Sequence, residues 1–579
     1  MAYYSALVSL VQLLEEISRY DHDRYRNFLL RNKQIIKALH EKFSLLLMSL
    51  EDYSSKGDEA TDCLERRIRD ASYQAQDIIE SQILNVIHSK DESPSILYLQ
   101  KVKGEVDSIM EEVMRIKESH KTENFQLNYY SEESGSSASG MVGFDEHLIT
   151  IKAQLCGEST KLRIIPIVGM GGIGKTTLTR NIFDDKLIAY YFYIRVWVTI
   201  SQDYYNQKVL RSIQASINVS NKESREVEDG ELPEYIYKHL KGKKYLIVMD
   251  DMWDTKVLND VKSILPNDSN GSRIIITTRL LDVANYAATF VSFHQMEFLN
   301  KEESWNLLRN KMFAQEQCPP ELEDTGNIIA HNCRGLPLAI VVVAGVLSKV
   351  NRTRYDWEKI AGNVSSVVTE NDEYFSKILY LSYNHLPHHL KPCFLYFGAF
   401  PQDYEISVSR LIKLWIAGGF LRPIESKTLE EVAEEYLEDL SKRNLVLLTK
   451  NRSNGKLKSC SILHDLLRDL CTQRLRYENF FQLIDENQCF SSKVVESLHI
   501  AKGMDNICHL RIHPSNLSCI GAEDIGSHVH SILCICYGYM TCYNLFAFAS
   551  AFKLLRVLDA LHIEFTSFPN EIVELFHLM

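Results

Sequence analysis

A glycine-rich segment carries the most specific chemistry in this sequence. It reads Gly169-Met170-Gly171-Gly172-Ile173-Gly174-Lys175-Thr176-Thr177 and matches G-x-x-x-x-G-K-[ST]. Glycines let backbone N–H groups turn inward around a phosphate, and a following helix adds partial positive charge at its N-terminus. Lys175 would reach the β- and γ-phosphates, and Thr176 would ligate Mg²⁺. We therefore predict a nucleotide phosphate site at residues 169–177.

Two acids and an arginine follow other apolar runs. Asp250 and Asp251 end the run that begins at Tyr245, and Arg279 follows the run 274–278. Mg²⁺ needs hard oxygen partners, so Asp250 is the candidate for its shell, through water, and Asp251 could polarise an attacking water. An arginine after a strand is usually a surface residue, but beside these two motifs Arg279 is predicted to sense the terminal phosphate.

These residues need a parallel sheet to bring them together. Short apolar, β-rich runs at 162–168, 194–198, 245–249 and 273–277 alternate with helical stretches. Near-continuous apolar strands separated by helices indicate a parallel sheet that is buried on both faces. These motifs predict a P-loop NTPase, but they do not distinguish a motor, a kinase, a GTPase and a switch from one another.

The first 116 residues show only helical patterns. Apolar residues recur at spacings of three and four in four stripes, which include Leu10, Phe43, Ile68 and Val106. Such stripes predict four amphipathic helices in an intramolecular bundle. Residues 117–140 are rich in Ser, Gly and Glu and read as a flexible linker.

The C-terminal half has mixed patterns. Helical patterns run from 302 to 386, a mixed segment runs from 390 to about 483, and leucines and isoleucines between 554 and 578 resemble one leucine-rich repeat unit. An earlier run at 530–533 is a candidate degenerate strand, with Leu533 and Leu558 a repeat length apart. The alternating Cys534 and Cys536 are expected to be small buried hydrophobes on one strand.

Composition excludes several classes of protein. At about 100–200 residues per domain, 579 residues suggest three to five domains. A formal charge of −12 argues against bulk attraction to nucleic acid or anionic membrane. The thirteen cysteines show no zinc-ligand spacing, the N-terminus lacks a secretory signal pattern, and no apolar run reaches the roughly 20 residues of a membrane helix. We expect a reducing, cytoplasmic environment.

Further motifs identify a family. Residues 192–202 (FYIRVWVTISQ), 299–313 (LNKEESWNLLRNKMF), 335–339 (GLPLA), 393–404 (CFLYFGAFPQDY), 411–421 (LIKLWIAGGFL) and 463–465 (LHD) occur in that order. Together they resemble plant intracellular immune receptors (NLRs) with a coiled coil, an NB-ARC module and leucine-rich repeats. The amino-acid sequences of these blocks are most similar to those of the late blight resistance-like subgroup of the family.

The resemblance implies a multidomain fold. It gives an Rx-type coiled-coil four-helix bundle at 1–116, the linker at 117–140, a P-loop α/β nucleotide-binding domain at 141–301, a helical ARC1 subdomain at 302–389, a winged-helix ARC2 subdomain at 390–490 and a short, truncated start of a leucine-rich-repeat domain at 491–579. The motifs thus leave 89 residues for repeats. Repeat arrays need at least about three units, so we expect a truncated receptor.

The resemblance also implies roles for individual residues. Val142 would border the adenine, Pro337 would pack on the adenine ring, and His464 would reach the β-phosphate of ADP. Without the family pattern, a satisfied core histidine is the better interpretation of His464. The resemblance implies that this contact of His464 with ADP locks the closed state. Leu463 replaces the family's usual Met and roughly conserves its volume, so we expect the lock to survive.

The N-terminal region departs from the family at two places. The acidic EDVID-type motif, which docks the coiled coil on basic repeats, is present as Gln76-Asp77-Ile78-Ile79-Glu80, with Gln76 in place of an acid. The first seven residues, MAYYSAL, differ from the motif of helper receptors that insert in membranes. We therefore do not expect direct pore formation.

We predict an ADP/ATP-gated switch that triggers defence and hypersensitive cell death on perception of a pathogen effector or a host guardee. At most it would be a slow ATPase. The expected partners also include helper receptors and further copies of the chain, with peripheral membrane association after activation and no nucleic acid. Two alternatives stay open: a catalytic P-loop ATPase, such as a motor or kinase-like enzyme, and a winged-helix regulator of transcription. Turnover of about 1–100 s⁻¹ would indicate an enzyme.

Overall fold

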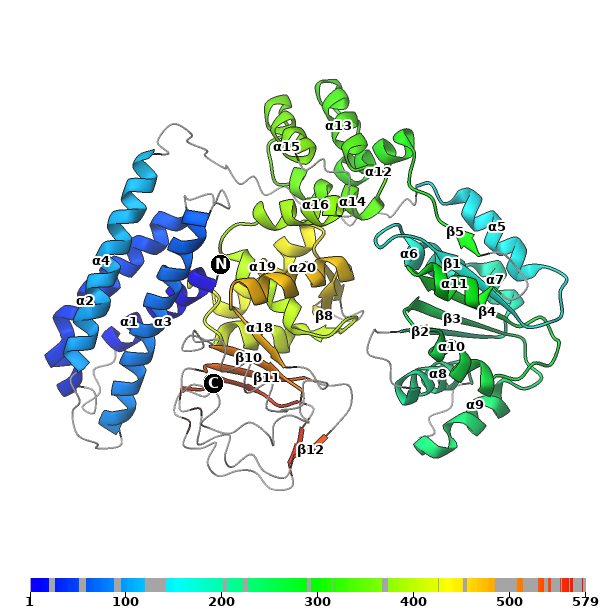
Figure 1. The fold of residues 1–579 in the computed structure, drawn as a ribbon, viewed down its shortest axis with the longest axis horizontal. Coiled ribbons are helices and arrows are strands. Elements are labelled where there is room, and N and C mark those ends of the chain that lie inside the picture. The colour runs from blue at the N-terminus through cyan, green and yellow to red at the C-terminus, as the bar shows by residue number, and fades with distance from the viewer. Residues whose placement is uncertain are drawn as a thin grey trace. The chain divides into compact units, whose positions relative to one another are not determined.

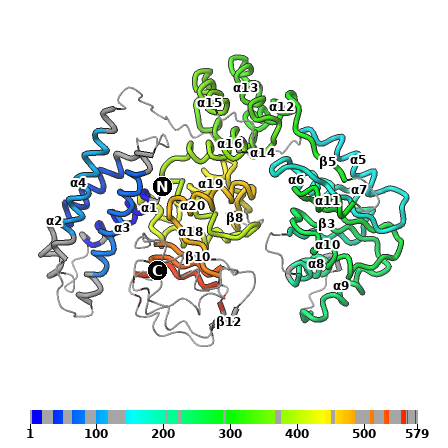
Figure 2. The backbone as a smooth tube through the Cα atoms, in the orientation of Figure 1, coloured from blue at the N-terminus to red at the C-terminus, as the bar shows by residue number. Residues whose placement is uncertain are grey.

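The computed structural model contains two compact units (Figure 1). One unit comprises residues 1–128 and 383–579, and the other comprises residues 129–382. Figure 2 traces the same backbone, with the residues left undescribed in grey. The structure describes residues 2–19, 26–51, 59–87, 95–119, 142–200, 206–221, 227–288, 293–314, 316–366, 373–424, 426–450, 456–484, 508–513, 529–535, 540–542, 552, 554–561, 563–565 and 575.

A five-stranded parallel sheet lies at the centre of the 129–382 unit. Its strands, in the order β2-β3-β4-β1-β5, are β1 (Arg163–Val168), β2 (Ile194–Thr199), β3 (Tyr245–Met252), β4 (Arg273–Thr278) and β5 (His294–Gln295). All four pairings are parallel, and the register sets Ile164 opposite Ile274 and Val196 opposite Ile247. The predicted parallel sheet is confirmed, and each predicted strand is found.

Helices cover both faces of this sheet, which explains why its strands are apolar throughout. Along β3, Leu246 and Val248 enter one core cluster, whereas Ile247 and Met249 enter the other. The helices of the first face are α5 (Asp145–Cys156), α6 (Lys175–Asp184) and α7 (Lys186–Tyr191). Those of the second are α8 (Asn206–Asn221), α9 (Leu232–Leu240), α10 (Thr255–Ile264) and α11 (Leu281–Ala287), with a short 3₁₀ turn η1 (Asp229–Glu231).

The first core cluster continues into a group of helices. These are α12 (Lys301–Phe313), α13 (Pro320–Asn332), α14 (Pro337–Leu347), α15 (Arg354–Ser366) and α16 (Glu373–Asn384). A capping box between Asn300 and Glu303 fixes the start of α12. Helix α14 is apolar on all sides because its side chains are buried almost without exception. The parallel sheet and these helices therefore share one continuous core.

The four predicted N-terminal helices are present in the other unit. They are α1 (Ala2–Arg19), α2 (Arg26–Glu51), α3 (Glu59–Ile87) and α4 (Ser95–Ser119), and they pack together as a bundle. Leu10, Phe43, Ile68 and Val106, one from each predicted stripe, are fully buried. Helix α4 extends to Ser119, three residues into the predicted linker, and the rest of that linker lies outside the described residues.

The segment predicted as a winged helix combines short helices with a small antiparallel sheet. Its elements are α17 (Leu390–Leu395), η2 (Tyr396–Ala399), β6 (Ile406–Ser407), α18 (Val408–Ala417), α19 (Leu429–Lys442), β7 (Val446–Lys450), β8 (Leu457–Ile462) and α20 (Asp465–Tyr477). The strands pair in the order β6-β8-β7. A capping box between Thr428 and Glu431 begins α19.

The C-terminal region contains more strands than the single repeat unit predicted. Four short strands pair in parallel in the order β13-β11-β10-β9: β9 (Gln482–Ile484), β10 (His509–Ile512), β11 (Ser531–Cys534) and β13 (Val557–Asp559). A second ladder joins β12 (Met540–Cys542) to β14 (Ile563–Phe565). The strand β9 belongs to the segment assigned to the winged helix, and β10 was not foreseen because His509 and Arg511 interrupt its apolar pattern.

Register also corrects the repeat spacing. Ile532, rather than Leu533, lies opposite Leu558. Cys534 is buried on β11 as expected, whereas Cys536 lies outside the described residues. In the part of the chain that the structure describes, no disulfide joins two cysteines and no three potential ligands form a metal cluster. No helix among the same residues has the length and apolar character to cross a membrane.

Candidate functional site

The predicted phosphate loop connects β1 to α6 at the carboxyl edge of the parallel sheet. A hydrogen bond from Ile173 N to Met170 O (3.3 Å) closes the turn, and one from Gly169 N to Thr278 O (3.3 Å) ties the loop to the end of β4. Ile173 is buried in the first core cluster. The loop is thus fixed to the sheet at its start and anchored by an apolar side chain at its centre.

Two loop glycines are required by backbone conformation and by close neighbours. Gly172 has a φ of 80°, and a Cβ there would lie 2.7 Å from Cβ of Leu338. Gly174 has a φ of 102°, and its Cβ would lie 2.7 Å from the ring of Phe144. Both φ values fall where L-residues with side chains are strained. The backbone also pairs across this contact, because Leu338 N donates to Gly172 O at 3.1 Å.

Lys175 and the threonines begin α6. The Lys175 side chain is buried, and its Nζ donates to Gly169 O (2.8 Å) and Met170 O (3.0 Å) within the loop. Thr176 and Thr177 are exposed in the first helical turn. Gly174 is the N-cap of the helix, so no N-cap side chain accepts from the first N–H groups of α6. These donors and Lys175 suit an anion such as a nucleotide phosphate.

Asp250 lies beside the threonine of the loop. Its Oδ1 accepts hydrogen bonds from Thr176 Oγ1 at 3.1 Å and from Thr277 Oγ1 at 2.5 Å. Burial raises the pKa of Asp250, although these two hydrogen bonds oppose the rise. A buried carboxylate next to a threonine hydroxyl is a donor set that suits a hard cation such as Mg²⁺.

Asp251 and Arg279 are brought together. Asp251 sits where β3 breaks its register with β4 and has a φ of 54°. Its Oδ1 lies 3.5 Å from Arg279 Nε, its Oδ2 accepts from Trp253 Nε1 at 3.1 Å, and the Arg279 guanidinium lies over the Trp253 ring. The carboxylate expected to polarise water and the cation expected to sense phosphate are therefore ion-paired.

Residues 335–339, which carry the GLPL motif, and Val142 both lie next to the first core cluster. Pro337 is the first residue of α14, after a turn in which Leu299 N donates to Gly335 O at 2.9 Å. Val142 and Leu299 both pack against the first core cluster. Through Leu338, the start of α14 also contacts the phosphate loop. The structure thus brings the start of α14 to the phosphate loop, whereas Val142 is placed only against the shared core.

His464 belongs to the other unit and is described by itself. It is the N-cap of α20, and its Nδ1 accepts from Leu466 N at 3.2 Å. A ring nitrogen that accepts carries no proton, so the neutral ring holds its proton on Nε2. The preceding residue is anchored, since Leu463 N donates to Leu445 O at 3.0 Å. His464 is therefore oriented as a donor through Nε2.

Sequence reasoning missed four residues of the site. Thr277 bridges the two acids, because its Oγ1 also accepts from Asp251 N at 2.8 Å. Trp253 contacts both partners of the Asp251–Arg279 pair. Phe144 and Leu338 pack against loop glycines. Thr277 could have been found from the sequence, because the Thr-Thr pair that ends the apolar run 274–278 places hydroxyl groups at the end of a strand. The contacts of the other three residues depend on tertiary structure.

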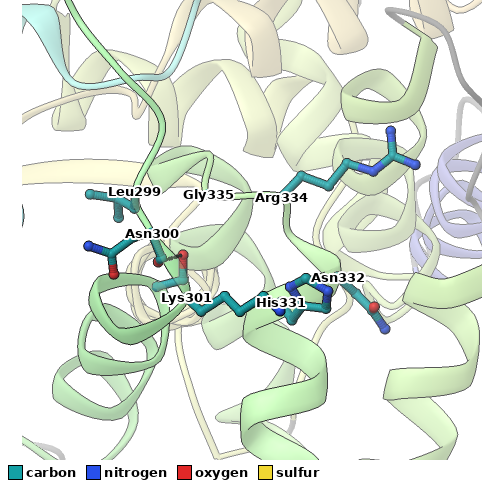
Figure 3. A pocket seen from close by; sticks show the side chains of 8 residues that line it. Leu299, Asn300, Lys301, His331, Asn332, Arg334 and Gly335 are labelled. Atoms are coloured by element: carbon teal, nitrogen blue, oxygen red, sulfur yellow. Dashed lines mark hydrogen bonds between the residues drawn. The ribbon is translucent and has the colours of Figure 1, made fainter.

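A separate cavity of about 600 Å³ lies among the helices that follow the sheet. No residue of the phosphate loop lines it. Figure 3 shows Lys301, at the start of α12, extending toward His331 at the end of α13. The lining residues are Leu299, Asn300, Lys301, Ser304, His331, Asn332, Arg334 and Gly335.

The acidic face of α3 contacts the C-terminal strands. Asp77 Oδ1 lies 3.0 Å from His530 Nε2, and Glu80 is ion-paired with Arg556. Gln76 is also buried on this face. His530 and Arg556 directly precede β11 and β13, respectively. The two acids that the motif retains therefore meet basic residues of the parallel strands, as the family pattern implies.

Comparisons with known proteins agree with this geometry. The model of the NB-ARC domain matches residues 144–318, and the model of the disease resistance protein winged helix domain matches residues 399–471. The fold and the site thus define a P-loop nucleotide-binding protein of the NB-ARC class.

The relatives specify the class further. A putative late blight resistance protein homolog, R1B-12 of Solanum demissum, is 38% identical over 454 residues, which cover 76% of this chain and 32% of the relative. Late blight resistance protein R1-A of the same species is 36% identical over 444 residues, 75% of this chain and 34% of the relative. The chain belongs to the late blight resistance group of NB-ARC disease-resistance proteins. It spans about a third of the length of these relatives.

A solved structure, the signal transduction ATPase (STAND) protein with a tetratricopeptide repeat sensor from Pyrococcus horikoshii, is 17% identical. The match covers 65% of this chain and 48% of that chain, with a TM-score of 0.36.

Gly172→Ala should damage the contact between the loop and α14. The positive φ costs about 1–3 kcal/mol for a residue with a side chain, and the added methyl group overlaps Leu338. We expect a lower thermal midpoint and ADP affinity reduced about tenfold or more, measured by titration. The control is Gly362→Ala in α15, where nothing lies within 4 Å and the change should be neutral or slightly stabilising. Equal behaviour of the two variants would contradict this account.

The α3 contact should depend on pH. Burial disfavours the charged form of His530, but hydrogen bonds to Asp77 and Cys508 outweigh burial and raise its pKa to about 10. The unfolded chain titrates near 6.5, so folding takes up a proton between pH 6.5 and 10. The contact therefore stabilises fully below pH 6.5, and this contribution is lost as the pH rises through 10.

His530→Gln should lower the thermal midpoint at pH 6 by roughly 3 °C or more, and the difference from wild type should shrink toward pH 10. The exposed His331→Gln is the control and should melt like wild type at every pH. A His530→Gln deficit that is constant across this range would show that the charge of His530 is not what stabilises the contact.

Proposed function

We propose that this chain contains the nucleotide-gated switch of a plant immune receptor that triggers defence and hypersensitive cell death. The observation that carries the proposal is the joined site of the 129–382 unit, in which the phosphate loop, Asp250 and the start of α14 are linked by hydrogen bonds. The late blight resistance relatives support the immune role. The chain spans only a third of those relatives, so the activity of the whole receptor is part of the proposal.

The ligand we propose is ADP in the resting state and ATP in the active state, with Mg²⁺. Residues 169–177 would hold the phosphates with their N–H groups and Lys175. Thr176 and Asp250 would hold Mg²⁺, which supplies charge neutralisation at the phosphates. Val142 and Pro337 would flank the adenine. The buried cation Lys175 and the buried acid Asp250 support these roles, because their charges are complementary to a phosphate and to a divalent cation, respectively.

The switch we propose depends on different affinities of two conformations for ADP and ATP. Pro337 and His464 would favour the closed conformation by contacting ADP from two subdomains. The donor orientation of His464 Nε2 supports its role at the β-phosphate. Arg279 would leave Asp251 to sense the terminal phosphate of ATP, which adds negative charge near the guanidinium.

Recognition and signalling would involve other molecules. We propose a pathogen effector or a host guardee as the trigger, and self-association after activation. Helper receptors would extend the signal, and the active form would move from the cytoplasm to the periphery of the plasma membrane. These partners follow from the family of the relatives and not from a contact in this chain.

The two alternative functions are less well supported. A motor or kinase-like ATPase needs a carboxylate ready to activate a nucleophile, but Asp251 is engaged by Arg279 and Trp253. A transcription regulator would need a basic surface for nucleic acid, whereas the chain carries a net charge of −12. We therefore propose at most slow ATP turnover.

Lys175→Arg should abolish nucleotide binding and signalling. Arginine is bulkier and cannot act as a point charge where the Nζ of Lys175 fits between two loop carbonyls. The purified variant should carry no detectable ADP, and its expression in leaf tissue should give no cell death under conditions where the wild type does. The control is Lys256→Arg, on the exposed side of α10. A Lys175→Arg protein that retains ADP would overturn the proposed function.

A further inference from the structure

The cavity among the helices that follow the sheet is bounded by three short pieces of chain. They are the entry to α12 (299–304), the end of α13 (331–332) and the turn before α14 (334–335). Every described residue that lines the cavity belongs to the 129–382 unit. Its volume of about 600 Å³ falls within the range of roughly 300–1,000 Å³ that small-molecule sites occupy.

The side chains around this cavity carry charge of one sign. Lys301, His331 and Arg334 are basic, and none of the described lining residues is acidic. Glu302 and Glu303 follow Lys301 on α12 but do not line the cavity. A concave surface lined by one sign of charge focuses the electric field and concentrates ions of the opposite sign. The cavity is therefore suited to an anion, although the chain as a whole carries a charge of −12.

Two of the basic groups converge from different helices. Lys301 is the first residue of α12, and its side chain extends toward His331 in the last turn of α13 (Figure 3). Within the part of the chain that the structure describes, neither side chain has an ion-pair or hydrogen-bond partner. An anion between Lys301 and His331 would contact both groups at once, which no acid of the described chain does.

The walls of the cavity are fixed by hydrogen bonds. Leu299 N donates to Gly335 O at 2.9 Å, and a Cβ at Gly335 would lie 2.3 Å from Leu299 O. The start of α12 is therefore held directly against the turn that leads into α14. At the end of α13, Asn332 Nδ2 donates to Ser365 Oγ of α15 at 2.6 Å. A cavity formed in advance binds a ligand at a low cost in conformational entropy.

The turn after α13 contains an arginine at a position that favours glycine. Arg334 follows the C-cap residue Cys333 and has a φ of 50°. Helices commonly end with glycine at this position, because the left-handed conformation strains residues with a side chain. Strained residues of this kind cluster at ligand sites. The strain at Arg334 therefore supports a function for the cationic side chain beside the cavity.

We propose that this cavity binds a small, soluble anion that carries two or more phosphate groups, with Lys301 and His331 as its direct contacts. A lysine ammonium group pairs with phosphate as a point charge. More than one phosphate is expected, because three basic side chains line the cavity. The site is separate from the nucleotide site, since no residue of the phosphate loop lines it. A bound anion would bridge α12 and α13 and stabilise the folded chain by mass action.

The test uses inorganic tripolyphosphate as the probe. The full-length chain is titrated by calorimetry at constant ionic strength, with saturating ADP to occupy the phosphate loop. We expect saturable binding that Lys301→Gln weakens about tenfold or more, because a charged contact is lost. His331→Gln should weaken it less. The control is Lys262→Gln at the exposed end of α10, which should bind like the wild type.

Two results would overturn the inference: no saturable binding to the wild type, or equal affinities of the wild type and Lys301→Gln. Binding that occurs only without ADP would place the probe on the phosphate loop instead. Sedimentation with phosphatidylcholine vesicles that contain phosphatidylinositol phosphate tests a lipid head group as the source of the phosphates. Vesicle binding that depends on Lys301, without binding of tripolyphosphate, would contradict a soluble ligand. A chain that binds no ADP would overturn the proposed function, whereas Lys301→Gln would still decide this inference.

Discussion

The close approach of α14 to the phosphate loop is the constraint on which the nucleotide site depends. The approach needs glycine at position 172, because any Cβ would overlap Leu338, and it is fixed by the bond from Leu338 N to Gly172 O. The loop is thereby held between the sheet and the following helices. Because both belong to one apolar core, a change in the loop acts directly on α14.

The charged residues of the site are arranged in pairs that a nucleotide would rearrange. Lys175 bonds its own loop, Asp250 accepts from two threonines, and Asp251 holds Arg279. Each group is satisfied within the protein, so none is left buried and uncompensated. In the proposed switch, phosphate and Mg²⁺ compete for these groups, which links binding to local rearrangement.

Much of the site could be predicted from the sequence because its signals are local. The loop motif, the acids that end one apolar run and the Thr-Thr-Arg that ends another are each contiguous, and parallel strands bring their carboxyl ends to one edge. Trp253 and Phe144 could not be predicted, since their contacts depend on how distant segments pack. The strand β10 was missed because His509 and Arg511 are buried polar residues in a short strand.

In the N-terminal bundle, too, the helices could be predicted from local patterns, whereas the long-range polar contacts could not. Its apolar stripes predict four helices, but no pattern within α3 indicates that Arg69 caps another helix while Arg67 pairs within the bundle. Arg67 and Arg69 lie two positions apart on α3, so the helical period points their side chains to different sides of the helix. Long-range polar contacts of this kind, including Asp77 with His530, carry no local sequence signal unless a family pattern supplies it.

In the proposed switch, a diphosphate nucleotide on the phosphate loop acts on α14 through the contact of Gly172 with Leu338. Hydrogen exchange of the purified chain with and without ADP tests it most directly, through the amide of Leu338 and its neighbours at 335–340. We expect ADP to slow exchange both at 169–177 and at 335–340. Protection confined to the loop, with exchange at 335–340 unchanged, would contradict it.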